Sequence, residues 1–75
     1  MQIRLTRGTF VRLQKELMAA QRLNNLRLYK IIKSLLMIAD DMPMDTIARL
    51  LNVSIRTIYD WFCRFMVEKF SWILA

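Results

Sequence analysis

The sequence predicts an all-α fold, a single bundle of three or four helices. It is 56% hydrophobic, which is too apolar for a disordered chain. Its 75 residues include one glycine and one proline, so the breaks that a sheet of hairpins needs are scarce. Hydrophobic residues recur at spacings of three and four along most of the chain, as on the buried face of a helix. Because a chain of this length has room for one core, we expect a single domain over residues 1–75.

The first helix is expected to follow a short extended arm formed by residues 1–5. Thr6 is the predicted N-cap, because its hydroxyl can accept a hydrogen bond from a backbone amide of the first turn. The helix then runs to about Ala20. Its core-facing side chains recur at helical spacing and are Phe10, Leu13, Leu17 and Ala20.

A second helix is expected after a polar segment, with Asn24 or Asn25 as its N-cap. Its hydrophobic side chains recur at helical spacing and are Leu28, Ile31, Ile32, Leu35, Leu36 and Ala39. Another side of this helix carries three basic residues spaced by three, namely Arg27, Lys30 and Lys33. Such a row is either a solvated helix face or a set of phosphate contacts. Pro43 ends the segment, because proline disfavours the α conformation of the residue before it.

Two further helical segments are separated by only three residues. The first covers residues 44–51, and the second begins at Ile55 and runs to about Lys69. Between them stands Asn52, the residue type other than glycine that best tolerates the left-handed conformation of a tight corner. Ser54 is the predicted N-cap of the second segment.

Together these segments match a helix-turn-helix over residues 44–69. Ala48 is small enough to let two helices cross closely, and Val53 fills the corner between them. Ile58 and Trp61 anchor the second helix to the core. Since the near-perpendicular crossing fixes the spacing of these four positions, their joint occurrence indicates a helix-turn-helix. An ordinary bundle with a tight corner is the alternative.

The second helix of the motif is the expected recognition helix, lying in the major groove of duplex DNA. Its core-facing side chains are expected to be Ile58, Trp61, Phe62 and Phe65. The side chains left to meet DNA are Ser54, Ile55, Arg56, Thr57, Tyr59, Asp60 and Arg64. Asp60 lies four residues from both Arg56 and Arg64, so the alternative is that it pairs with these arginines. Cys63 also falls on the side nearer the groove, and it is expected to be a small, half-buried residue without a reactive role.

The roles of the DNA-facing side chains follow from their chemistry. Arg56 and Arg64 suit guanine edges or phosphates, and Ile55 suits the methyl groups of thymine. The hydroxyls of Ser54 and Thr57 suit phosphate oxygens. The basic row on the preceding helix is expected to neutralise further phosphates.

The basic charge of the chain is concentrated in its first half. The net charge is +6. Residues 1–39 carry eight Lys and Arg against one acidic residue, Glu16, which gives +7. Residues 40–75 carry four basic against five acidic residues, which gives −1. A positive balance of this size favours a polyanion as partner, either nucleic acid or an anionic membrane surface.

The residue types also limit the chemistry of the chain. With no histidine and one cysteine, it excludes Ser-His-Asp and Cys-His catalysis, cysteine–histidine metal sites and an internal disulfide. We therefore expect no enzyme, no cofactor, no metal site and no small-molecule substrate. Asp40, Asp41 and Asp45 are assigned to helix ends rather than to Mg²⁺. No apolar run is long enough for a membrane span, and no signal-peptide pattern is present.

The chain resembles the N-terminal region of bacterial insertion-sequence transposases of the mariner-related superfamily over roughly residues 5–70. The matching residues are Leu5-Thr6, the helix ending Leu35-Leu36-Met37-Ile38-Ala39, and Ile47-Ala48-Arg49-Leu50-Leu51-Asn52-Val53-Ser54-Ile55-Arg56-Thr57-Ile58-Tyr59-Asp60-Trp61. The resemblance implies a homeodomain-like bundle that binds the terminal inverted repeats of a mobile element in the bacterial cytoplasm, associated with the nucleoid. Members of that family usually have glycine at the position of Asn52 and more arginines along the recognition helix.

In that family, a second DNA-binding unit and a catalytic domain with an acidic metal-binding triad follow this region. The resemblance therefore implies a fragment without catalysis of its own. A set of apolar residues near the end of the chain would then pack on the missing domain or on a second copy, and these are Phe70, Trp72, Ile73 and Leu74.

Two other functions are weighed against this one. A stand-alone transcriptional regulator would use the same helix-turn-helix and would need a dimer interface, for which the apolar C-terminal residues are the candidate. A basic amphipathic protein at anionic membrane surfaces would fold on lipid rather than cooperatively in water. Duplex DNA, and not a membrane, is the partner that we expect.

Overall fold

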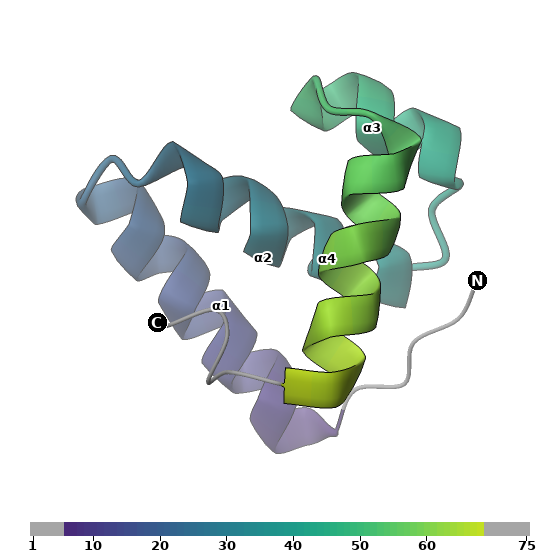
Figure 1. The fold of residues 1–75 in the computed structure, drawn as a ribbon. Helices are drawn as coiled ribbons and strands as arrows, with labels where there is room; N and C mark the ends of the chain where they lie inside the picture. Colours follow the sequence, from purple (N-terminus) through teal and green to yellow (C-terminus); the bar gives the residue numbers. More distant parts are fainter. Residues whose placement is uncertain (1–5, 69–75) are drawn as a thin grey trace.

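Four α-helices make up the described part of the chain (Figure 1). The structure is a computed structural model and describes residues 6–68. In chain order the helices are α1 (Arg7–Arg22), α2 (Leu26–Ala39), α3 (Met44–Leu51) and α4 (Ile55–Glu68). No strand occurs within residues 6–68, and the all-α prediction is confirmed. The predicted arm, Lys69 and the apolar residues near the end of the chain lie outside the described residues.

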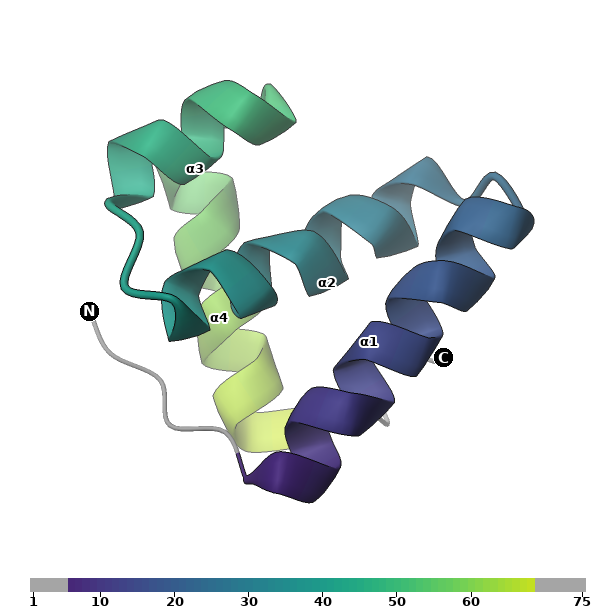
Figure 2. The ribbon, with the colours of Figure 1, turned by 180° about the vertical axis from the view of Figure 1, so that it is seen from behind.

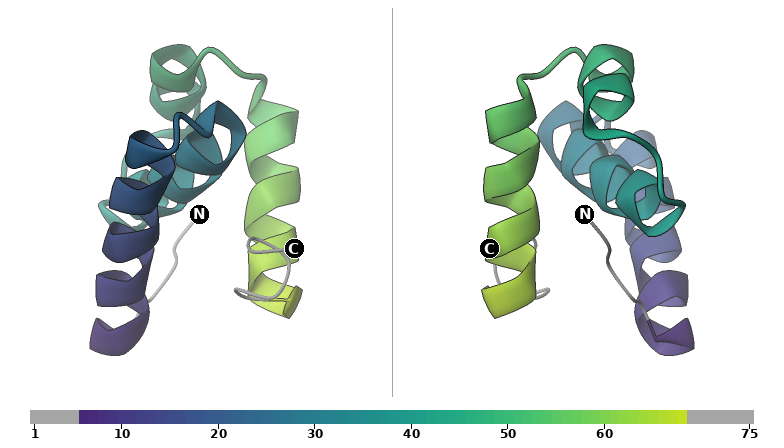
Figure 3. Two further views of the ribbon diagram at one scale, coloured as in Figure 1. Left: turned by 90° about the vertical axis from the view of Figure 1, so that its left-hand side faces the viewer. Right: turned by 90° about the vertical axis from the view of Figure 1, so that its right-hand side faces the viewer.

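The central helix of the fold is α2, which contacts each of the other three helices. α4 is the near helix in Figure 1, and α1 is the near helix in Figure 2, where the molecule is seen from behind. The side views separate the two helices, with α2 between them (Figure 3). α1 and α4 therefore lie on opposite sides of the fold.

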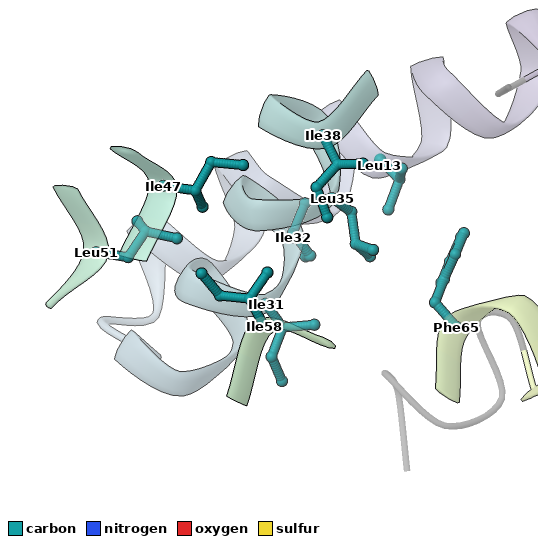
Figure 4. Packing of buried hydrophobic residues seen from close by; sticks show 9 residues of the cluster. All are labelled: Leu13, Ile31, Ile32, Leu35, Ile38, Ile47, Leu51, Ile58 and Phe65. Carbon is teal, nitrogen blue, oxygen red and sulfur yellow. The ribbon is translucent and has the colours of Figure 1, made fainter. Parts of the chain in front are cut away.

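The hydrophobic core draws on all four helices, with the largest share from α2 (Figure 4). Its buried cluster consists of Leu13, Ile31, Ile32, Leu35, Ile38, Ile47, Leu51, Ile58 and Phe65. The one buried polar side chain within residues 6–68, Ser34, donates its hydroxyl to the carbonyl of Ile31 at 2.7 Å. Phe10, which we expected to face the core, is 39% exposed. It lies one turn before Leu13, the first residue of α1 in the buried cluster.

The helix starts use the side chains that the sequence indicated. The Thr6 hydroxyl accepts a hydrogen bond from the amide of Thr9 at 3.2 Å. Of the two asparagines considered for α2, Asn25 is the N-cap, and its Oδ1 accepts from the amide of Leu28 at 3.2 Å. Each bond satisfies one of the amides that a helix leaves unpaired in its first turn.

The C-terminal ends of α1, α2 and α3 share one backbone capping conformation. Asn24, Asp41 and Asn52 follow these helices with φ values of 55°, 59° and 57°, in the left-handed region. In each case the next amide reaches back five residues to a helix carbonyl, in the bonds Asn25 to Ala20, Met42 to Met37 and Val53 to Ala48. The prediction for Asn52 is confirmed. The same role at the other two corners was not anticipated.

The acidic residues around Pro43 occupy helix ends, as expected. Asp40 is the C-cap of α2, Asp41 has the left-handed conformation just after it, and Asp45 lies in the first turn of α3. Within residues 6–68 no group of three His, Cys, Asp or Glu side chains is arranged to hold a metal ion. None of the helices in the described part of the chain combines the length and apolarity that crossing a bilayer requires.

Candidate nucleic-acid interface

The corner between α3 and α4 has the geometry of a helix-turn-helix. Asn52, the C-cap of α3, has φ 57° and ψ 48°. The amide of Val53 then bonds the carbonyl of Ala48 at 3.0 Å, which closes the turn. Val53 and Ala48 are both half-buried and pack against the core cluster. Because the backbone bond and the packing act on the same residues, the direction of α4 relative to α3 is fixed at this point.

Ser54 begins α4, as predicted. Its Oγ accepts a hydrogen bond from the amide of Thr57 at 3.1 Å, and the two hydroxyls lie 2.8 Å apart. Only one of these hydroxyls donates its proton to the other, so one proton stays available to an outside acceptor. The pair therefore combines the capping role with the ability to donate to a phosphate oxygen.

The two sides of α4 divide as the sequence predicted. Ile58 and Phe65 are buried, and Trp61 and Phe62 are half-buried against the core. The exposed side chains of the predicted interface are Ser54, Ile55, Arg56, Tyr59, Asp60 and Arg64, while Thr57 is half-buried. Cys63 is exposed, so the half-buried position expected for it is wrong. It lies five residues after Ile58, nearly one and a half turns on, which places it on the outward side.

Charges of opposite sign alternate along the outward side of α4. At successive spacings of four residues the helix presents Arg56, Asp60, Arg64 and Glu68. The guanidinium Nε of Arg64 bonds Glu68 Oε2 at 3.3 Å. Within residues 6–68 neither Arg56 nor Asp60 belongs to an ion pair, so the alternative in which Asp60 pairs with both arginines is not the observed arrangement. These four side chains leave the outward side of α4 without a net charge.

The basic row predicted on α2 is separate from the helix-turn-helix. Arg27 is exposed, and Lys30 and Lys33 are half-buried. None of the three belongs to an ion pair within the described residues. Half-buried lysines lay their methylene stems along the protein and keep the ammonium group in water. Lys30 and Lys33 therefore remain able to meet phosphates at the surface of α2.

A second group of basic side chains, on α1, was not among the predicted DNA contacts. Four of its residues are basic and exposed, and these are Arg7, Arg12, Lys15 and Arg22. Lys15 and Arg22 are seven residues apart, which is nearly two helical turns. This spacing was a signal in the sequence that one side of α1 would be basic.

One comparison with known proteins gives a match. A family model described as a homeodomain-like domain matches residues 25–69. The matched segment includes α2, α3 and α4 and leaves α1 outside. It covers more than half of the 75 residues, and it confirms the predicted homeodomain-like helix-turn-helix. No curated protein and no solved structure matches the chain significantly.

Proposed function

The chain belongs to the homeodomain-like domain family, and from this premise we propose that it binds duplex DNA with α4 in the major groove. A homeodomain-like helix-turn-helix suggests DNA as the partner. The observation that carries the proposal is the corner at Asn52, which fixes α4 against α3 while the outward side of α4 stays exposed.

Base reading is assigned to the first two turns of α4, which in a helix-turn-helix approach the base edges. Arg56 has an exposed guanidinium outside any ion pair of the described residues, and it suits the O6 and N7 acceptors of guanine. Ile55 is 43% exposed and Tyr59 is 46% exposed, so both present apolar surface that suits thymine methyl groups. The Ser54–Thr57 hydroxyl pair is assigned to a phosphate at the start of the helix.

Phosphate neutralisation is assigned to the basic row of α2. The outward side of α4 has no net charge, so it contributes little to the electrostatic part of the affinity. Arg27, Lys30 and Lys33 carry three positive charges, each of which can displace a counterion from the duplex. In this division α4 reads the sequence and α2 supplies affinity.

The biological role that we propose is recognition of the terminal inverted repeats of a mobile element, without catalysis by this chain. The support is the resemblance to transposase N-terminal regions described in the sequence analysis, which runs through the motif from Ile47 to Trp61. The exposed start of α4 is compatible with sequence-specific or semi-specific contacts of the kind that end recognition needs.

The test begins with selection from a random duplex library, followed by fluorescence anisotropy with the selected duplex. Between about 50 and 200 mM salt, the logarithm of affinity should fall linearly with the logarithm of salt, by about 0.9 for each phosphate contact. Arg56→Ala should weaken binding of the selected duplex by about tenfold, as expected for one lost guanine contact.

The matched control is Arg49→Ala, which removes the same charge from α3. Arg49 is exposed and pairs with Asp45 at 3.7 Å, on the helix that precedes the corner. Its removal should change affinity less than removal of Arg56 and should leave the base preference unchanged. A folded sample that binds no duplex at 50 mM salt contradicts the proposal. If the selected sequence occurs in promoters and is not flanked by inverted repeats, the proposal of DNA binding stands. The role would then be that of a transcriptional regulator and not recognition of transposon ends.

A further inference from the structure

The helix outside the family match, α1, presents a strongly basic surface. Its exposed residues include Arg7, Arg12, Lys15 and Arg22, which we call the α1 basic face. The one acidic residue of α1, Glu16, is half-buried and lies about one turn after Arg12, at the edge of this face that is farthest from Arg7, Lys15 and Arg22. The contrast with α4 is direct, because α4 carries as many acidic as basic residues. Within the described residues, the part of the α1 basic face around Arg7, Lys15 and Arg22 is thus a surface of one sign.

The spacing of these side chains suits a nucleic-acid backbone. Lys15 and Arg22 lie seven residues apart, so they fall on one side of the helix about 10 Å from each other. Arg7 lies within about a quarter of a turn of this line, and the row from Arg7 to Arg22 is about 22 Å long. Each strand of B-DNA carries one phosphate for every 3.4 Å or so of helix axis. A row of this length therefore passes several phosphates of one strand.

The α1 basic face points away from the duplex that α4 is proposed to hold. α1 and α4 lie on opposite sides of the fold, with α2 between them (Figures 1–3). Leu13 of α1 and Phe65 of α4 are buried in the same core cluster. Since each helix turns its buried side toward that core, the outward sides face in opposite directions. One straight duplex cannot lie against both.

We propose that the α1 basic face binds the phosphate backbone of a second duplex, so that one chain bridges two DNA segments. The proposal rests on the binding of a first duplex by α4. Contacts to the second duplex are made by Arg7, Lys15 and Arg22 and go to phosphates, so they carry no base preference. Bridging should therefore be more sensitive to salt than recognition of the first site.

A lipid surface fits α1 less well than a phosphate backbone. A helix that lies in a membrane interface buries a continuous apolar side among the lipids. The apolar side of α1, with Leu13 and Ala20, is already buried in the core. On the outward side Val11 is 43% and Met18 is 59% exposed, but they stand seven residues apart among basic residues. The outward side thus offers charge with little apolar area.

The test measures energy transfer between two copies of the selected duplex, one carrying a donor dye and the other an acceptor, on addition of the whole chain. The variant is the triple Arg7→Ala, Lys15→Ala and Arg22→Ala, which keeps good helix formers in α1. The matched control is Gln14→Ala with Gln21→Ala, which changes exposed positions of the same helix without changing charge. Two further measurements are made on each variant. Fluorescence anisotropy gives the affinity for a single duplex, and a binding assay with vesicles containing phosphatidylserine tests for a membrane contact.

The wild-type chain and the glutamine control should produce energy transfer. The triple variant should bind the second duplex at least tenfold more weakly, since about three counterion-releasing contacts are lost. At about 150 mM salt its affinity for the first duplex should be nearly unchanged, because charges on the far side are screened over about 8 Å.

Five results would overturn the inference. Energy transfer that survives in the triple variant would assign bridging to self-association of the chain. An equal loss of affinity for the first and the second duplex in that variant would mean that α1 carries the single DNA-binding surface. Absence of energy transfer with normal single-duplex binding would leave the proposed function intact and remove the second site. Vesicle binding that depends on the three basic residues, without bridging, would make the face a membrane contact. Failure to bind any duplex would remove the proposed function as well.

Discussion

The outward sides of α1 and α4 show two ways of using an exposed helix. On α4, arginines and acidic residues alternate, and Arg64 is held by Glu68 at 3.3 Å. On α1, four basic residues share the outward side, while Glu16 is half-buried. α4 is joined to α3 by a corner whose backbone is fixed at Asn52. The difference indicates that two properties lie on different helices. α4 is held in a defined orientation, whereas the net positive charge is carried by α1 and α2.

The same two helices also differ in their relation to the family fold. α4 falls within the homeodomain-like match, and α1 precedes it. Yet Leu13 of α1 and Ile58 of α4 are both completely buried in one cluster. By this criterion α1 is an integral part of the folding unit. Four pairs of substitutions test how far the two regions are equivalent.

Truncation of the core should have the largest effect and should be similar at both helices. Leu13→Ala and Ile58→Ala each remove buried methyl groups, so each should lower the free energy of unfolding by about 2–5 kcal/mol in urea denaturation. If either variant is unfolded, Ile58→Val should still show a loss of about 0.5–1.5 kcal/mol. Val11→Ala, at an exposed position of α1, is the control. A loss at Leu13 no larger than at Val11 would show that α1 is only loosely attached.

Changes at the corners should come next in size. Asn52→Ala forces a β-carbon of a residue without a local hydrogen-bonding side chain into the left-handed region, which costs about 1–2 kcal/mol. Asn24→Ala, at the corner between α1 and α2, should cost a similar amount. The variants with glycine at either position should be more stable than the alanine variants, because glycine adopts the left-handed conformation without steric cost. Thermal unfolding of the four variants gives the comparison, and equal stability of the alanine and glycine variants would contradict the φ values.

Loss of an N-cap should have a smaller effect on stability, of about 1 kcal/mol at each helix. Thr6→Ala removes the cap of α1, and Ser54→Ala removes that of α4. The two variants should differ in DNA affinity, because only Ser54 adjoins the proposed phosphate contact. Fluorescence anisotropy with the selected duplex at one salt concentration gives the DNA affinity of each variant. Equal DNA affinities would remove Ser54 from the interface.

Removal of one acidic charge should have the smallest effect. Asp60→Asn should raise affinity for duplex DNA by about threefold at low salt, because a carboxylate close to phosphates is lost from α4. Glu16→Gln, which removes the same charge from α1, is the control and should change single-duplex affinity less. An Asp60 variant that binds more weakly would show that this carboxylate accepts from a base, as carboxylates do from cytosine N4.

Features of the fold that depend on neighbouring residues could be predicted from the sequence. The bounds of α3, the left-handed Asn52 and the cap at Ser54 follow from the chemistry of residues a few positions apart. The inward side of α4 followed from helical periodicity, because Ile58 and Phe65 are separated by seven residues.

Features that depend on tertiary placement could not be predicted. The exposure of Phe10 depends on how far the other helices cover it, which the periodicity of one helix does not contain. The choice of Glu68 rather than Asp60 by Arg64 depends on rotamers, since both carboxylates are four residues away. The opposite directions of the outward sides of α1 and α4 follow only from their packing around α2 (Figure 3).

The position of the duplex on α4 is tested most directly by nuclear magnetic resonance titration of the isotope-labelled chain with the selected duplex. With the duplex below one equivalent, backbone amide shifts should change most over residues 54–60 and should change little around Lys15. Changes at Lys15 and Arg22 should follow only when duplex is in excess. Early changes confined to α1, with α4 unaffected, would contradict the assignment of DNA recognition to the helix-turn-helix.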